Sequence, residues 1–194
     1  MNETRKQKIV AVVQKRQSGI ILVLEDIHDP HNAAAILRTC DGLGIQHVYF
    51  ISEKEKPYDP KRIGKASSSS ANKWLDFKTY TTTVTCLKEL NKEGYAIIAT
   101  ALTSHSESLL TATFPEKKVA VLVGNEHAGL SKTALSLADR SILIPMMGFV
   151  QSFNVSVATA IMLWEITRQR HGTLMLSTKK QDVLLKDFLK RSGK

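Results

Sequence analysis

The chain has 194 residues, of which 43% are apolar and 23% charged, a globular rather than a disordered composition. There are 27 Lys and Arg residues against 18 Asp and Glu, a net charge of +9, so a negatively charged partner is favoured. Two cysteines cannot build a disulfide framework, and a reducing, cytoplasmic setting is expected. No apolar run approaches the roughly 18 residues that span a bilayer, and the first residues lack the apolar segment of a signal peptide, so we expect neither a membrane-spanning nor a secreted protein.

The basic charge is concentrated at the two ends of the chain. Residues 1–16 hold five Lys and Arg against one acidic residue, residues 168–194 hold eight against two, and the residues between them hold 14 against 15. Basic segments neutralise phosphates and give salt-sensitive affinity for nucleic acid, although solubility alone is the simpler explanation. We therefore expect a basic helical arm over 1–17, a body over 18–170 and a basic tail over 171–194.

Taken in chain order, the hydrophobic pattern alternates strands with helices. Strands are predicted at 20–24, 47–51, 74–77, 95–100, 119–123 and 141–144, and helices at 30–43, 84–93, 132–138 and 154–170, with an amphipathic stretch at 182–189. The polar segment 53–72, with its prolines and serines, is predicted to be a loop with a short helix. This alternation predicts an α/β fold with a parallel sheet flanked by helices, and ligands at the carboxyl ends of the strands.

Several common sites are disfavoured. The chain has no Gly-rich loop of the nucleoside-triphosphatase type, and Gly42 and Gly44 follow a helix, unlike a dinucleotide fingerprint. His28 and His31 have no further ligands nearby to complete a metal site, so loop or capping roles are expected and no metal is predicted. Cys40 lies in a helical apolar pattern and is expected in the core.

Two segments carry polar residues in suggestive positions. Asn32 and Arg38 are six residues apart, about 600° of helix rotation, which we interpret as placing them near one helix face; a helical arginine is otherwise a surface charge. The segment 124–131 follows a buried strand, and its two glycines allow a tight turn and a close approach of a ligand to the backbone. Glu126 within it either caps the loop or serves a site.

A third segment, 144–156, interrupts an apolar context with polar residues just before a long helix. Ser152 or Asn154 either caps that helix or belongs to a site. Together and in this order, Asn32 with Arg38, then GNEHAGLS, then IPMMGFVQSFNVSVA resemble the three motifs of the SPOUT class of RNA methyltransferases. More closely, they resemble the TrmH (SpoU) family of ribose 2′-O-methyltransferases, over roughly residues 18–170.

The resemblance implies an α/β fold whose C-terminal part is threaded into a deep trefoil knot. The knot loops would match Gly124–Ser131 and Pro145–Phe153 and would bind S-adenosylmethionine. It also implies a homodimer in which each active site is completed across the interface. Helix 154–170 is the candidate for much of that interface, with core packing as its alternative. By motif position, the expected cofactor contacts are Thr100, Leu102, Gly124, Ile144 and Phe153.

The implied reaction is methyl transfer to a ribose 2′-hydroxyl of tRNA, with guanosine 18 of the D-loop as the expected target. A sulfonium methyl group is already electrophilic, so the difficulty lies in the weakly acidic hydroxyl, which needs a base or a stabilised alkoxide. Arg38 matches the family's essential arginine. A guanidinium resists deprotonation, with a pKa above about 12, so we expect Arg38 to anchor the target phosphate and stabilise the alkoxide. Water, or Arg38 with a lowered pKa, would be the base.

The other catalytic candidates follow from the same motifs. Asn32 would orient Arg38 or the ribose, and Glu126 would organise the knot loop and the target nucleoside. Ser152 and Asn154 would fix the cofactor loop and the approach of the hydroxyl. The opening residues and the phrase His28-x-Pro30-His31-Asn32 are most similar to family members that act on tRNA.

Two other functions stay open. A family member that methylates ribosomal RNA or another tRNA position is the nearer alternative, and a non-catalytic RNA-binding protein on the same fold is the remote one. RNA contacts are expected from basic residues at both ends of the body, namely Arg5, Lys8, Lys15, Arg16, Arg168 and Arg170.

Overall fold

A computed structural model of the chain describes residues 2–63, 71–170, 172 and 174–193. A parallel sheet of seven strands runs through the body in the order β3-β2-β1-β6-β4-β7-β5. The strands are β1 (Ile20–Glu25), β2 (His47–Ile51), β3 (Asp76–Tyr80), β4 (Ala96–Thr100), β5 (Glu107–Ser108), β6 (Val119–Val123) and β7 (Arg140–Leu143). The helices are α1 (Glu3–Gln14), α2 (Pro30–Gly42), η1 (Ala71–Lys73), α3 (Thr83–Lys92), α4 (Lys132–Leu137), α5 (Val155–Arg170) and α6 (Thr178–Ser192).

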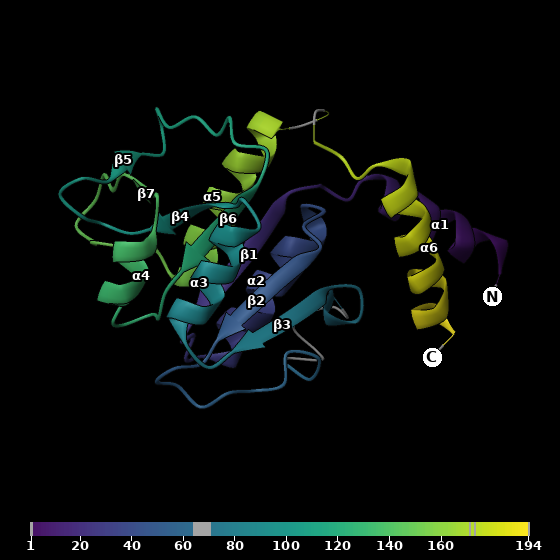
Figure 1. The fold of residues 1–194 in the computed structure, drawn as a ribbon, viewed down its shortest axis with the longest axis horizontal. Helices are drawn as coiled ribbons and strands as arrows, with labels where there is room; N and C mark the ends of the chain where they lie inside the picture. The colour runs from purple at the N-terminus through teal and green to yellow at the C-terminus, as the bar shows by residue number, and fades with distance from the viewer. Residues whose placement is uncertain (1, 64–70, 171, 173, 194) are drawn as a thin grey trace.

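Helices cover both faces of this sheet (Figure 1). Successive side chains of a strand point to opposite faces, so Ile20, Leu22 and Leu24 of β1 join one core with α2 and α5. Ile21 and Val23 join a second core with α3 and α4. All six residues of β1 are buried, as expected for a central parallel strand covered on both sides. The predicted α/β class is therefore confirmed.

Most predicted elements are present with shifts of one or two residues at their ends. The largest shift of a strand concerns the one expected at 74–77, which the structure has at Asp76–Tyr80. Trp74 instead follows η1, and its ring packs on Phe188 of α6 with the ring centroids 5.1 Å apart. The amphipathic stretch expected at 182–189 is part of the longer helix α6. The two-residue strand β5 was not predicted. The short helix expected within 53–72 corresponds to η1, and residues 64–70 of that segment lie outside the described residues.

The two basic ends of the chain pack against one another. Helices α1 and α6 form a small core of their own from Ile9, Val13, Leu184 and Phe188. They lie side by side at one end of the molecule, where both termini are found (Figure 1). No helix in the described residues is long and apolar enough to cross a membrane.

Candidate functional site

Three segments meet beyond the carboxyl ends of the strands. His28 follows β1, Glu126 follows β6, and Asn154 precedes α5. The carboxylate of Glu126 accepts hydrogen bonds from the backbone N–H groups of His28, at 2.9 Å, and Asp29, at 3.1 Å. It accepts a third from the side-chain amide of Asn32 at 3.0 Å. Glu126 therefore ties the beginning of α2 to the loop after β6.

Asn154 extends this set of contacts to α5. Its side-chain amide donates a hydrogen bond to Oδ1 of Asn32 at 3.0 Å. Its own Oδ1 accepts from the backbone N–H of Ser156 at 2.8 Å and from the Ser156 hydroxyl at 2.6 Å. Asn154 thus caps α5 and also contacts Asn32. We refer to Asn32, Glu126 and Asn154 as the polar cluster.

Electrostatics keep the Glu126 carboxylate ionised. Its partial burial acts to raise the pKa, but the hydrogen bonds from Asn32 and from the backbone N–H groups of His28 and Asp29 outweigh burial, so the pKa of Glu126 lies below its ordinary value. Hydrogen bonds to the charged form of a carboxylate have this effect. An ionised carboxylate accepts hydrogen bonds only, so Glu126 orients the amide of Asn32 with its nitrogen toward the carboxylate and its oxygen toward Asn154.

The loop after β6 presents Glu126 on a rigid turn. Asn125 and Gly129 exchange two backbone hydrogen bonds, of 3.1 and 2.9 Å. A Cβ atom on Gly124 would lie 2.4 Å from the carbonyl carbon of Gly129, and Gly129 itself has φ of +67°, so both positions favour glycine. The Oδ1 atom of Asn125 accepts hydrogen bonds from the N–H groups of His127 and Ala128. These contacts hold the turn closed.

Arg38 and Ser152 are not brought into the polar cluster. Both side chains are exposed, and no hydrogen bond or ion pair joins either of them to another described residue. The expectation that Arg38 and Asn32 share a helix face is wrong, because 600° leaves the two side chains about 120° apart around α2. Arg38 lies instead on the side of α2 that carries Gly42, one helical turn further on.

Four of the five expected cofactor contacts lie at or just beyond the carboxyl ends of β6, β4 and β7, which are neighbours in the sheet. The fifth, Phe153, lies just before α5. The Thr100 hydroxyl donates to the carbonyl of Leu122 at 3.0 Å, so it joins β4 to β6. Leu102 is 78% exposed and Phe153 40% exposed, while Ile144 is half-buried and Gly124 buried. Apolar side chains are therefore open to solvent at this edge.

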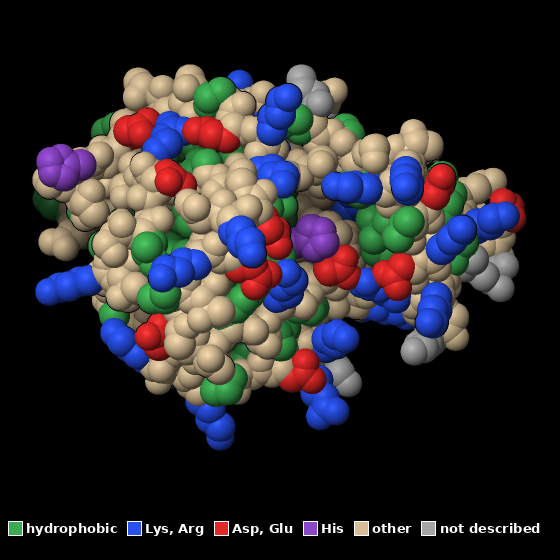
Figure 2. Space-filling model, viewed as in Figure 1, with side chains coloured by type: hydrophobic (Ala, Val, Ile, Leu, Met, Phe, Trp, Pro, Cys, Tyr) green, Lys and Arg blue, Asp and Glu red, His purple; other side chains and the backbone are tan. Residues whose placement is uncertain are grey.

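The expected RNA contacts divide into exposed and buried residues. Arg5, Lys8 and Lys15 are exposed at or next to α1. Arg168 is exposed too, and its guanidinium donates to both carboxylate oxygens of Glu165 at 2.8 and 2.7 Å. Several Lys and Arg side chains lie on the visible surface of the α1–α6 end, among acidic and apolar side chains (Figure 2).

Two of the expected RNA contacts are wrong. Arg16 is fully buried, with its guanidinium 2.5 Å from the carboxylate of Asp41 and over the ring of Phe188. Arg170 is buried as well and donates to backbone carbonyls that include those of Glu116, at 2.7 Å, and Ser18, at 2.9 Å. Arg16 joins the N-terminal arm to the body, whereas Arg170 joins the end of α5 to the backbone just before β1 and β6. Neither side chain is accessible to phosphates.

His28 is not among the site residues expected from the motifs. Its backbone N–H donates to Glu126, and its Nδ1 atom lies 2.9 Å from Oε2 of Glu55. The hydrogen bond and the charge of Glu55 raise the pKa of His28. Any residue type except proline can donate a backbone hydrogen bond, so the identity of residue 28 does not predict its contact with Glu126. Only the position of His28 in the loop before Asn32 could have indicated that contact.

Cys40 is buried, as predicted, and burial raises the pKa of its thiol. Cys86 is buried too. Among the residues that the structure describes, no group of three or more His, Cys, Asp and Glu side chains could hold a metal ion.

Comparison with known proteins supports the resemblance found in the motifs. The model of the SpoU rRNA methylase family matches residues 19–164. The tRNA (guanosine(18)-2′-O)-methyltransferase of Thermus thermophilus is 37% identical over 168 residues, which cover 87% of this chain and 84% of that protein. The crystal structure of the A. aeolicus TrmH/SpoU tRNA modifying enzyme superimposes with a TM-score of 0.85 at 31% identity, over 98% of this chain and 97% of that one.

An AdoMet-bound rRNA methyltransferase from Sinorhizobium meliloti is 25% identical, with a TM-score of 0.69 over 82% of this chain and 59% of that one. The family match covers the seven-stranded sheet and the polar cluster alike. This chain therefore belongs to the SpoU methylase family.

Proposed function

We propose that this protein transfers a methyl group from S-adenosylmethionine to a ribose 2′-hydroxyl of tRNA, with guanosine 18 as the target. The observation that carries this proposal is the polar cluster, in which residues from all three family motifs are joined by hydrogen bonds. The relatives named as tRNA (guanosine(18)-2′-O)-methyltransferases support the choice of substrate. Ribosomal RNA is the second candidate, because a structural relative is named an rRNA methyltransferase.

The residues at the ends of β4, β6 and β7 fit S-adenosylmethionine. Leu102 and Phe153 offer exposed apolar surface, which suits a purine ring, and the backbone beyond each strand offers N–H and carbonyl groups for its polar edges. When bound, this cofactor supplies an electrophilic methyl group on a sulfonium. Thr100, Gly124 and Ile144 would complete the site, and we propose that the loops 124–131 and 145–153 form the trefoil knot of the family there.

The protein's own residues then act on the ribose. Glu126 fixes the orientation of Asn32, and Asn32 with Asn154 positions the hydroxyl and the loop beside it. Arg38, which is exposed, is free to hold the target phosphate and to stabilise the alkoxide as the proton leaves to water. Ser152 lies in the same segment as Asn154 and would contact the cofactor loop or the ribose.

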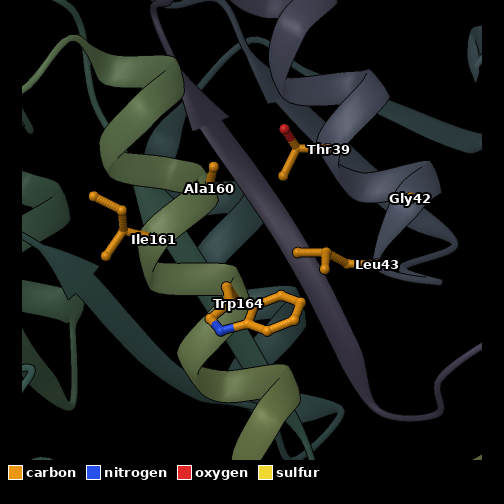
Figure 3. A pocket seen from close by; sticks show the side chains of 6 residues that line it. All are labelled: Thr39, Gly42, Leu43, Ala160, Ile161 and Trp164. Atoms are coloured by element: carbon orange, nitrogen blue, oxygen red, sulfur yellow. The ribbon is translucent and has the colours of Figure 1, made fainter.

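A homodimer would place Arg38 in a closed site. An apolar groove of about 540 Å³ lies between α2 and α5 and is lined by Thr39, Gly42, Leu43, Ala160, Ile161 and Trp164. Trp164 is 60% exposed and projects toward Leu43 across this groove (Figure 3). A second copy of the chain packed here would cover the indole and bring its own residues beside Arg38, since Arg38 and Gly42 share one side of α2.

The ends of the chain would hold the RNA. We propose that the arm over 1–17 and the tail over 171–194 act together with the body over 18–170, with Arg5, Lys8, Lys15 and Arg168 facing phosphates. Because Arg168 is already paired with Glu165, RNA must compete with that carboxylate. The protein would act in the cytoplasm, where its RNA substrate is found.

Mapping of the methylated nucleotide tests the proposal. Purified protein, S-adenosylmethionine and unmodified tRNA or ribosomal RNA are incubated, and the nucleosides are identified by mass spectrometry. We expect 2′-O-methylguanosine at position 18 of tRNA. Methylation confined to ribosomal RNA would favour the second candidate, and no methylation of either RNA would favour a non-catalytic RNA-binding protein.

A further inference from the structure

A cavity of about 300 Å³ lies at the carboxyl end of β1. Glu25, Asp26, residues 54–55 and parts of the loop after β6 line it. A volume of that order is at the lower end of the range for ligand sites. We refer to it as the β1 cavity.

Hydrogen bonds fix the walls of the β1 cavity. The Oδ1 atom of Asp26 accepts from the backbone N–H groups of Glu53, Lys54 and Glu55, at 2.8, 3.0 and 3.1 Å. Asp26 has φ of +51°, which few residues other than glycine adopt. Its backbone carbonyl accepts a hydrogen bond from the side-chain amide of Asn125 at 2.8 Å. Asp26 therefore holds both the segment 53–55 and the loop after β6 in place around the cavity.

The second carboxylate in the walls is also held by hydrogen bonds. Glu25 is buried and accepts hydrogen bonds from the Ser131 backbone N–H and hydroxyl, both at 2.8 Å, and from the Thr83 hydroxyl at 2.5 Å. Glu25 therefore holds the fold together through both of its carboxylate oxygens, and Asp26 does so through Oδ1.

Three charged groups of the lining remain available. Neither ammonium group of Lys54 and Lys132 has a hydrogen bond or ion pair with another residue in the described part of the chain. Glu55 uses Oε2 for His28, and no described residue bonds to its Oε1. The cavity thus offers two cationic donors and one carboxylate acceptor on a rigid frame.

His28 links the β1 cavity to the polar cluster. Its ring bonds Glu55 in the cavity wall, and its backbone N–H bonds Glu126 in the cluster. One residue, His28, thus contacts both the cavity wall and the polar cluster at which the ribose is proposed to lie.

From this arrangement we infer that the β1 cavity receives the base of the target nucleoside and that Glu55 selects guanine. The inference rests on the proposed function, methyl transfer to a guanosine ribose. Guanine presents two adjacent donors, N1–H and the N2 amino group, which match the free Oε1 atom of Glu55 and the remaining lone pair of its Oε2 atom. Its acceptors at O6 and N7 match an ammonium group.

Other ligands fit these groups less well. Adenine has no donor at N1, so a carboxylate would face a lone pair. A phosphate would suit Lys54 and Lys132 but would be repelled by Glu55. Among the nucleic-acid bases, guanine alone offers a carboxylate two adjacent donors, and it also has acceptors for ammonium groups.

Inosine in place of the target guanosine tests the inference, because inosine lacks only the N2 amino group. For tRNA transcripts that differ at this one base, kcat/KM of the wild-type protein should favour guanosine by about tenfold or more. In Glu55→Gln the ratio of kcat/KM for guanosine over inosine should fall to about one. The substitution replaces one carboxylate oxygen by an NH2 group, which cannot accept a hydrogen bond from the second guanine donor. Glu53→Gln, in the same loop but outside the cavity lining, is the matched control and should keep the wild-type ratio.

The ratio of kcat/KM on the two transcripts distinguishes a loss of base recognition from a loss of folding, because a partly folded variant loses activity on both transcripts alike. Lys54→Met should lower kcat/KM on the guanosine transcript, and Lys56→Met, whose side chain is outside the lining, should not. An unchanged ratio in Glu55→Gln, or a wild-type protein that does not distinguish the two bases, would overturn the inference while leaving the proposed function intact. No transfer to either transcript by the wild-type protein would instead contradict the proposed function and, with it, this inference.

Discussion

Asn32 and Asn154 are 122 positions apart in the chain, and a hydrogen bond of 3.0 Å joins their side-chain amides. Because Asn32 also donates to Glu126, its amide group is held at both ends and cannot rotate freely. An amide restrained in this way is suited to position a reacting group with little loss of entropy in the reaction.

Removal of this amide should impair methyl transfer more than cofactor binding. Asn32→Ala should lower the single-turnover rate of methyl transfer by about 100-fold, the order expected for misplacement of a reacting group. Calorimetric titration should show S-adenosylmethionine affinity close to that of the wild type. Asn91→Ala, at an exposed amide on α3, is the control and should have the wild-type rate, and a wild-type rate in Asn32→Ala would contradict the assigned role.

Arg38 is exposed and its side chain has no hydrogen bond or ion pair with another described residue, so its removal should leave the fold intact. Arg38→Ala should lower the rate by about 10²–10³, the loss seen when one stabiliser of a developing oxyanion is removed. Cofactor affinity should be nearly unchanged in the same titration. Lys92→Ala, which removes an exposed cation from α3, should retain activity; retained transfer in Arg38→Ala would exclude Arg38 from the reaction.

The lowered pKa of Glu126 makes one contribution to stability depend on pH. The ionised carboxylate of Glu126 stabilises the folded chain at every pH above 4.5, the ordinary pKa of a glutamate. This stabilisation is lost as the pH falls from 4.5 through the lower pKa that Glu126 has in the folded chain. Glu126→Gln does not titrate. The difference in free energy of unfolding between wild type and Glu126→Gln, from urea titrations, should therefore narrow between neutral pH and about pH 3.

Asn91→Ala, which changes an exposed side chain on α3 and removes no titratable group, should show no comparable narrowing. A constant difference for Glu126→Gln over the same pH range would mean that its hydrogen bonds do not favour the charged form.

A charge in the groove between α2 and α5 should separate the proposed dimer. Trp164→Asp would place a carboxylate where an apolar partner surface is expected, and burial of an unpaired charge is strongly unfavourable. Analytical ultracentrifugation should show a shift from dimer to monomer, together with loss of methyl transfer. Val84→Asp, at an exposed apolar position on α3, should leave the oligomeric state unchanged; a wild type that is monomeric at assay concentration would rule out the dimer.

Arg16 and Lys15 are adjacent in sequence, but their substitution should affect different properties, stability for Arg16 and tRNA binding for Lys15. Arg16→Ala leaves the carboxylate of Asp41 without its buried partner and should lower the free energy of unfolding by about 2–4 kcal/mol. Lys15→Ala should change stability by less than about 0.5 kcal/mol but should weaken tRNA binding and lower the slope of log K against log salt by about 1. Urea titrations and filter binding at several salt concentrations measure the two effects, and equal effects of both substitutions on the salt slope would contradict this assignment.

The body of the fold could be predicted because its signals are local. The runs IILVL and VAVLV predict buried parallel strands from composition alone, and Asp29 followed by Pro30 predicts where α2 begins. The polar cluster could be anticipated only through its motifs, since nothing local indicates that Glu126 meets Asn32.

The errors also have physical causes. A basic residue at a chain end is usually solvated, so the burial of Arg16 and Arg170 depends on tertiary partners such as Asp41 and the carbonyls near Ser18. The contact of Trp74 with Phe188 likewise moves the start of β3, because it joins segments far apart in sequence.

The pairing of α1 with α6 leaves both termini on one side of the molecule (Figure 1). An affinity tag or a fluorescent protein fused at either terminus would therefore stand beside the same basic surface. Such a fusion would shield that surface from a polyanion while leaving the reaction chemistry untouched, so cleavage of the tag before any affinity measurement is advisable.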